Sequence, residues 1–300
     1  MNTHAKLALL FSFTGLVAGC GGGGDSPAAN PPATTTTGTF VDSATQGIAY
    51  TCGTTTGVTD ANGTFNFVAG DNCTFKLGGI TLGTAAGKSL LTPVDLVVGA
   101  SSETNPVVSN IAQFLISLDN DSNPANGIVI DPAVQTALAG KALDFTLAPA
   151  AFVSAAQALV SAVIAGRTLV STAAAQAHLG VTLAGRFSGA YNCTYSGVAT
   201  NGTQSANVSG TAAVSIASGV VTGSAQTTAT PLPPAVAVTG TISSTGNAAL
   251  NVATGSTSDG AGWSGSFLLD GSGSGTWRDP ATGTTPSGTV ASGNWSCHKA

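Results

Sequence analysis

The sequence predicts a mainly β protein with an α-helical segment in its middle, and three observations lead to this fold class. Residues 39–98 contain short β-branched and aromatic runs separated by turns, which is typical of a small antiparallel sandwich. Apolar residues then recur with the period of a helix over residues 99–183. Residues 184–300 return to short strands with Gly and Ser turns, which favours an antiparallel meander or a small barrel.

The first β region shows the spacing of successive hairpins. Residues 60–63 supply a turn of Asp, Ala, Asn and Gly, and residues 64–67 alternate between Phe and polar side chains. A further strand is expected at residues 73–77, after the turn at residues 70–72. Alternation of this kind gives each strand one buried face, so we expect an N-terminal sandwich.

The middle segment is expected to form helices that pack on the sandwich. The first helix is predicted by apolar residues that share one helical face, namely Val107, Ile111, Phe114, Leu115 and Leu118. Asp131 and Pro132 are typical of a helix start. Two further helices are expected at residues 152–163 and 169–179, the second ended by Gly180.

Eight strands are expected in residues 184–300, connected by Gly, Ser, Asn and Asp turns. They are placed at residues 187–195, 208–216, 220–227, 236–242, 248–252, 263–269, 275–278 and 289–297. Small residues alternate with few large apolar ones, which favours a small closed or nearly closed barrel over a thick sandwich.

The N-terminal residues have the features of a lipoprotein signal peptide at residues 1–19. Lys6 is followed by an apolar run at residues 7–17, which is too short for a membrane-spanning helix. The sequence Val-Ala-Gly-Cys ending at Cys20 resembles the lipobox of bacterial lipoproteins. This resemblance implies that Cys20 is acylated, and Gly21, where an aspartate often signals inner-membrane retention, implies an outer-membrane location facing the periplasm or the cell surface.

A longer stretch resembles a module found in bacterial surface lipoproteins. The motifs are V-D-S-A-x-x-G-I-x-Y, G-V-T-D-A-N-G-T-F-x-F and N-I-A-Q-F-L-I-S-L-D-N-D, and the similarity covers residues 40–183. The resemblance implies a prealbumin-like β module and an envelope location, but no assigned activity. Residues 20–38 are rich in Gly, Pro and Thr, which is typical of a flexible tether.

Four cysteines besides Cys20 indicate two disulfide bonds, since the chain is expected to be exported to an oxidising compartment. Three pairings are possible. Sequence order and the division into domains favour Cys52–Cys73 and Cys193–Cys297. A zinc site is the alternative. Zinc-binding cysteines typically have the close Cys-x-x-Cys spacing, which neither pair shows.

The small number of charged residues limits the classes of partner that the protein is expected to bind. Charged residues make up 7% of the chain, and the net charge is −5. Nucleic acid binding is not expected, because it needs clustered Lys and Arg to neutralise phosphates. Contact with the membrane is therefore expected to depend on the acylated Cys20.

One acidic loop has the spacing of calcium ligands. Asp119, Asp121 and Asn123 occupy positions 1, 3 and 5 of an EF-hand-like loop. Pro124 stands where glycine is expected, and Ile130 where a bidentate glutamate should close the shell. The pattern favours a turn capped by Asp and Asn side chains, with a weak calcium site as the alternative and no other cofactor.

No catalytic residues are predicted, because no Gly-x-Ser-x-Gly elbow or cysteine nucleophile accompanies the histidines. We expect a non-catalytic binding, adhesion or structural module of the envelope, whose partner is a protein or a glycan. The alternative is a carrier of a small apolar ligand in the C-terminal barrel. An exposed patch with Tyr191, Trp263 or Trp277 would favour the module, and a lined internal cavity would favour the carrier.

Overall fold

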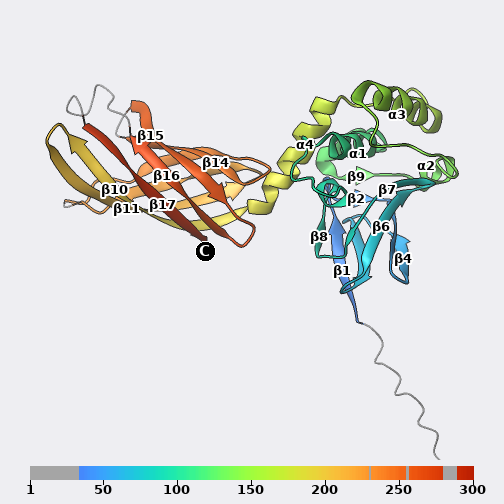
Figure 1. Cartoon of the computed structure of the whole chain (residues 1–300), viewed down its shortest axis with the longest axis horizontal. Helices are drawn as coiled ribbons and strands as arrows, with labels where there is room; N and C mark the ends of the chain where they lie inside the picture. The colour runs from blue at the N-terminus through green and yellow to red at the C-terminus, as the bar shows by residue number, and fades with distance from the viewer. Residues whose placement is uncertain (1–33, 230, 255–256, 280–288) are drawn as a thin grey trace, which may run out of the picture. The chain divides into compact units, whose positions relative to one another are not determined.

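The computed structural model describes residues 34–229, 231–254, 257–279 and 289–300. Cys20, the signal peptide and the first part of the predicted tether lie outside the described residues. The fold class is confirmed: small sheets with helices form an N-terminal module, and a closed antiparallel barrel follows in the sequence (Figure 1).

The N-terminal module contains three sheets. The first has the order β5-β1-β8, with β1 at Thr35–Phe40, β5 at Thr64–Val68 and β8 at Leu90–Leu91. The second has the order β4-β3-β6-β7, with β3 at Ala49–Cys52, β4 at Thr55–Val58, β6 at Asn72–Leu77 and β7 at Ile80–Ala86. The third pairs β2 (Thr45–Gln46) with β9 (Ile128–Val129) in parallel.

Aromatic side chains hold the first two sheets together. Phe65 of β5 meets Phe75 of β6 edge to face, with ring centroids 5.2 Å apart, and Phe40 of β1 lies 4.9 Å from Phe75. All three rings are fully buried. The predicted turn before β5 is also present, because the Asp60 carboxylate accepts from the backbone N–H groups of Asn62 and Thr64. The predicted sandwich thus has a continuous aromatic core.

The predicted tether is four residues too long at its C-terminal end. Residues 35–38 belong to β1, and their backbones pair with β5 in the register Thr35↔Val68 to Gly38↔Phe65. Backbone pairing needs only an extended chain, which β-branched threonine favours. A segment without apolar periodicity can therefore still form a strand. Position 38 requires glycine, because a Cβ there would lie only 2.4 Å from the Phe65 ring.

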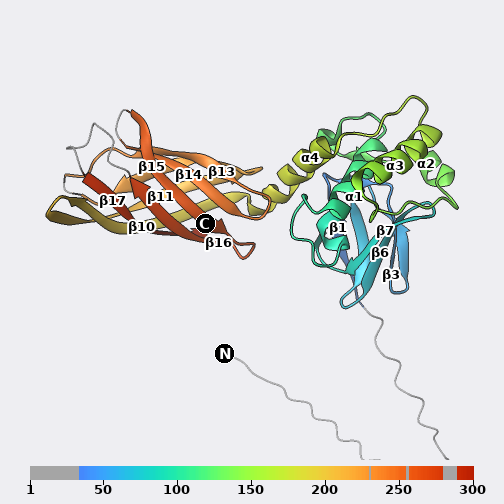
Figure 2. The ribbon, with the colours of Figure 1, turned by 45° about the horizontal axis from the view of Figure 1, so that its top comes forward.

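The helices of the module gather on one side and the strands on the other (Figures 1 and 2). They are α1 (Pro106–Ser117), α2 (Pro132–Ala137), α3 (Pro149–Val163) and α4 (Thr172–Ala184). The expectation that Gly180 ends the last helix is wrong. Gly180 keeps a helical backbone, and α4 continues so that Leu183 is fully buried.

Helix α1 is the centre of the helical layer, with residues 108–117 all buried. Its polar side chains bind neighbouring loops instead of water. The Asn110 amide donates to the carbonyl of Phe145 at 2.9 Å, and the Gln113 amide donates to the carbonyl of Val170. Buried polar groups are tolerated when they are hydrogen-bonded, so these side chains fix the loops around α1. No helix in the described part of the chain is long and apolar enough to cross a bilayer.

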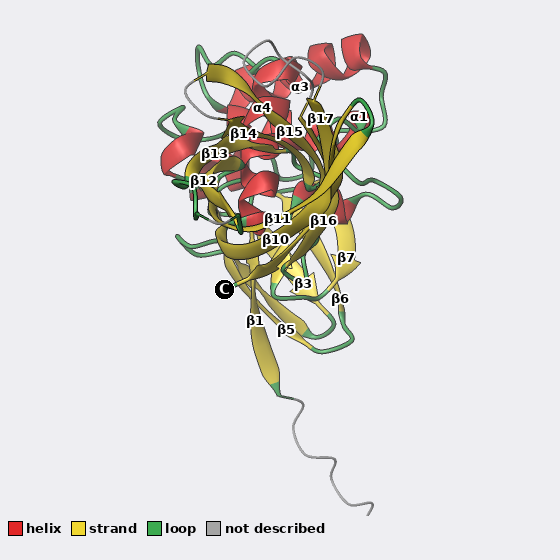
Figure 3. Ribbon diagram, turned by 90° about the vertical axis from the view of Figure 1, so that its left-hand side faces the viewer, coloured by secondary structure: helices red, strands yellow, loops and turns green. Residues whose placement is uncertain are grey.

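The C-terminal domain is a closed up-and-down barrel of eight strands, drawn as strands and loops in Figure 3. The strands are β10 (Gly189–Asn201), β11 (Gln204–Ala217), β12 (Val220–Thr227), β13 (Val236–Ile242), β14 (Asn247–Thr254), β15 (Thr257–Phe267), β16 (Ser272–Asp279) and β17 (Thr289–Lys299). Each pairs with the next in sequence, and β17 pairs with β10 to close the barrel. All eight predicted strands overlap an observed one.

Glycines inside the barrel make room for tryptophan. The Trp295 indole on β17 lies where a Cβ at Gly265 or Gly275 would be, at 2.6 and 2.7 Å from its ring atoms. Its Nε1–H donates to the backbone carbonyls of Ser264 and Thr276, both at 3.2 Å. The glycines therefore leave space inside the barrel for the tryptophan ring of another strand.

Both predicted disulfides are confirmed. Cys52 and Cys73 lie directly opposite each other on β3 and β6, and Cys193 and Cys297 do so on β10 and β17. The second bond joins the first and last strands of the barrel inside its core. Two disulfides indicate an extracytoplasmic protein, because cytosolic thiols are kept reduced.

Candidate functional site

A cavity of about 340 Å³ lies at one end of the barrel. It is formed by the last residues of β10, β12, β14 and β16 and the first residues of β11, β13, β15 and β17. Its wall is mainly apolar and aromatic, with Tyr195, Val208, Val236, Val252, Trp263 and Trp277 among the lining residues. Small-molecule sites are typically concave and mostly apolar, so this cavity is the leading candidate for a ligand site.

The sizes of the inward side chains explain why the cavity is at this end. Along β10 the inward side chains are large as far as Tyr195 and then small, at Gly197 and Ala199. The facing residue on β17 at the same end is Ala291. The opposite end is filled, because Tyr191 packs edge to face on Phe267 with centroids 5.0 Å apart. The sequence thus fills one half of the barrel and leaves the other partly empty.

Aromatic rings form the floor of the cavity. Tyr195 meets Trp263 edge to face at 5.2 Å and Trp277 at 6.0 Å. The two tryptophans are 4% and 5% exposed, and Tyr191 is 2% exposed. None of these three residues lies on an exposed patch, and a lined cavity is present at one end of the barrel.

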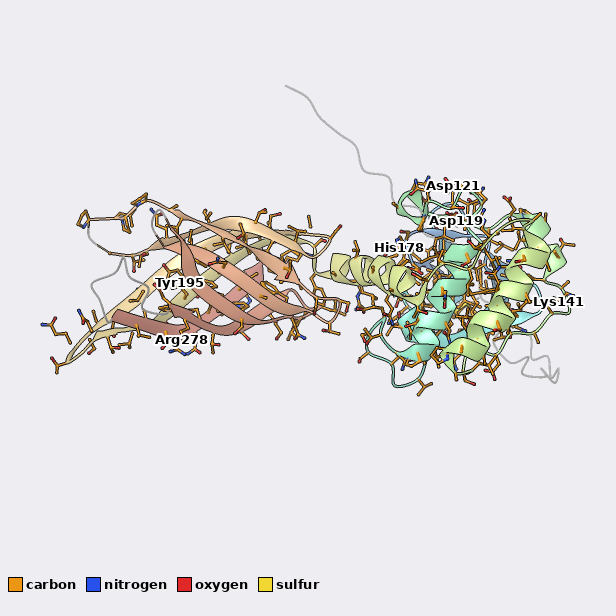
Figure 4. The ribbon with its side chains drawn as sticks, turned by 90° about the horizontal axis from the view of Figure 1, so that it is seen from above. Asp119, Asp121, Lys141, His178, Tyr195 and Arg278 are labelled. Carbon is orange, nitrogen blue, oxygen red and sulfur yellow. A yellow bond between two sulfur atoms is a disulfide. The ribbon has the colours of Figure 1, made fainter. Side chains whose placement is uncertain are left out.

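Asp279 is the one charged side chain among the described residues that line the cavity. It lies on β16 two residues beyond Trp277, on the same face of the strand, and burial raises the pKa of its carboxyl group. Its strand neighbour Arg278 is exposed and lies on the outer face (Figure 4). Among the described residues, the cavity therefore offers one charged group in a mainly apolar wall.

Comparison with protein-family models finds no match, and no curated protein is significantly similar to this sequence. The resemblance to surface lipoproteins stays a prediction from the motifs.

The structure brings Asp119, Asp121 and Asn123 together in the loop that follows α1, ahead of the short helix η2 (Pro124–Asn126). One oxygen of Asp121 accepts from the backbone N–H of Asn123 at 2.8 Å, and the other accepts from the Asn126 amide. These bonds are the capping turn that the sequence favours. Among the described residues, no three His, Cys, Asp or Glu side chains are grouped as metal ligands.

A buried pair that the sequence did not suggest lies next to this loop. Asp42, before β2, is fully buried, and neither of its carboxylate oxygens has a hydrogen-bond partner among the described residues. His178 of α4 approaches it, with Nε2 3.7 Å from Oδ1 of Asp42, 3.4 Å from its carbonyl oxygen and 3.1 Å from Oγ of Ser43. His178 also lines a pocket of about 310 Å³ with Ser122 and Arg167.

This Asp–His–Ser grouping differs from a hydrolase triad. In a triad the aspartate is hydrogen-bonded to one ring nitrogen of the histidine, and the serine is hydrogen-bonded to the other. Here Asp42 and Ser43 both face the Nε2 atom of His178. Burial raises the pKa of Asp42 and lowers the pKa of His178, so both shifts favour the uncharged forms. Because the pKa of Asp42 is higher in the folded protein, its contribution to stability is full below its ordinary pKa and is lost as the pH rises through the raised value.

Proposed function

We propose that this protein is an exported, non-catalytic binding protein, anchored through acylated Cys20 at the outer membrane, whose C-terminal barrel holds a small apolar ligand. The observation that carries the proposal is the cavity of about 340 Å³ lined by Tyr195, Trp263 and Trp277. Its volume is in the range of small-molecule sites. The disulfides and the lipobox-like sequence support export and anchoring.

The composition of the cavity supports binding over catalysis. General acid–base chemistry needs positioned titratable groups near the reacting atoms, and Asp279 is the single charged group among the described lining residues. Mainly apolar walls with a few polar groups are suited to holding a ligand in a preferred orientation. The earlier expectation of a partner-binding surface has less support, because the aromatic side chains that would form it are buried.

Filling the cavity is expected to abolish ligand binding. N-phenyl-1-naphthylamine, a neutral apolar dye that fluoresces in apolar surroundings, is the probe for titration of the purified protein. Ala291 faces the cavity from β17, and Ala291→Leu should weaken dye binding at least about tenfold, because the added carbons occupy the ligand's space. The matched control is Ala249→Leu, which adds the same side chain on the exposed face of β14.

Two results would contradict the proposal. One is the absence of saturable dye binding to the unmodified protein. The other is equal weakening by Ala291→Leu and Ala249→Leu, which would place the dye on the outside of the barrel or show a general loss of folding. Circular dichroism of both variants separates these explanations.

The anchoring part of the proposal has a separate test. Cys20→Ser removes the sulfur that would be acylated, so the variant is expected to leave the membrane fraction and appear as soluble protein. Fractionation of cells that express either form, followed by immunoblotting, measures this. A variant that still sediments with the outer membrane would disprove acylation at Cys20 as the anchor.

A further inference from the structure

We propose that the loop after α1 binds a calcium ion through the carboxylates of Asp119 and Asp121 and the side-chain oxygen of Asn123. The inference is independent of the barrel cavity. The site belongs to the N-terminal module, and its main feature is a buried oxygen atom that has no partner among the described residues.

That atom is Oδ2 of Asp119. The Asp119 side chain is 0% exposed, and its Oδ1 accepts from the backbone N–H of Val129 at 2.9 Å. Its Oδ2 is buried and has no hydrogen-bond partner among the described residues. An unpaired buried polar atom destabilises the fold, and more so when the group is charged. A cation at this position would remove this destabilisation.

The neighbouring carboxylate points to the same conclusion. Asp121 follows two residues after Asp119 in the same loop, and two ionised carboxylates that lie close together repel each other. Two carboxylates held this close are stabilised by a shared proton or by a cation, and a divalent ion would neutralise both. Figure 4 shows the two residues on the same loop.

The backbone of the loop is held in place by hydrogen bonds to its carbonyl and N–H groups. The Arg167 guanidinium donates to the carbonyl of Asp119 at 2.6 Å and to the carbonyl of Asn120 at 3.1 Å. The backbone N–H of Asn120 donates to the carbonyl of Val129. The backbone is therefore fixed before an ion arrives, and the ordering cost of binding is reduced.

The chemistry of the oxygens selects the ion. Carboxylate and amide oxygens are hard ligands that suit calcium, and calcium accepts irregular geometry with water completing its shell. Asp119 lies at the floor of the loop, while Asp121 and Asn123 are exposed at its rim, so an ion can enter from solvent. Two carboxylates without a bidentate glutamate correspond to the weak range of extracellular modules, a Kd of about 10⁻⁴ to 10⁻³ M.

The test is a calcium chloride titration of the isotope-labelled whole chain, followed by NMR. The amide signals of Asn123 and Val129, whose N–H groups bind the two carboxylates, should shift and saturate in the millimolar range. Asp121→Asn keeps an oxygen for the turn but removes one charge, and it should weaken calcium binding at least about tenfold. Magnesium chloride at the same concentrations should shift these signals less.

Asp144→Asn is the matched control, because Asp144 also accepts from the backbone N–H two residues on, at 2.8 Å. It should leave the calcium affinity unchanged. The proposal is overturned if calcium causes no saturable shift of the Asn123 and Val129 signals. It is also overturned if Asp121→Asn binds calcium as well as the unmodified chain, or if Asp144→Asn weakens binding equally.

Discussion

Replacing both Cys193 and Cys297 by alanine is expected to lower the free energy of unfolding of the barrel by about 4–5 kcal/mol. The bond joins strands β10 and β17 across 104 residues of sequence, and in the chain-entropy model a longer loop gives a larger effect. The three tryptophans of the chain, Trp263, Trp277 and Trp295, all belong to the barrel. Urea denaturation followed by tryptophan fluorescence therefore measures the barrel directly.

The matched control is the alanine pair at Cys52 and Cys73. That bond closes 21 residues within the N-terminal module, so the same model gives a smaller loss of about 3 kcal/mol there. In this control, the urea concentration at the midpoint of the tryptophan fluorescence transition should not change. If it shifts as far as in the barrel variant, the two domains unfold together and the separate cores do not act as independent units.

Gly265→Ala is expected to destabilise the barrel by about 2–3 kcal/mol, with a corresponding fall in Tm. The added Cβ would lie 2.2 Å from the carbonyl oxygen of Ser274 and 2.6 Å from the Trp295 ring. Neither group can move without shifting a strand or the tryptophan at the centre of the core. Thermal unfolding followed by tryptophan fluorescence measures the loss.

Gly262→Ala is the control for the glycine prediction. Gly262 lies on the same strand, β15, but on its exposed face, and the nearest atom to a Cβ there is 4.0 Å away. Alanine should be neutral or slightly stabilising at this position, because it reduces the entropy of the unfolded chain. If both alanine variants lost the same stability, the effect would come from reduced backbone flexibility and not from the space that Trp295 needs.

The sequence predicted the elements whose signal is local. Alternation of large and small residues with Gly turns placed all eight barrel strands, and the boundaries of β12 and β13 were correct to the residue. The disulfides followed from sequence order, because each bond joins two cysteines on neighbouring strands of the same sheet. Capping residues likewise predicted the start of α2 after Asp131.

Features that depend on distant residues were missed. Asp42 and His178 are 136 residues apart, and neither has a local pattern that would pair them. The cavity was only an alternative, because its volume depends on inward residues from several strands at the same depth, such as Ala199, Ala261 and Ala291. Their small size is visible in the sequence, but their common depth is set by the register of the closed sheet.

The closing pair of strands also sets an order of events during export. Strand β10 obtains its second neighbour only when β17 arrives, about a hundred residues later in synthesis and translocation. Until then β10 and β16 each present an unpaired edge, and such edges promote pairing with other chains. The barrel cannot reach its final topology before its last strand has left the cytoplasm, so β10 and β16 keep their unpaired edges until the end of export.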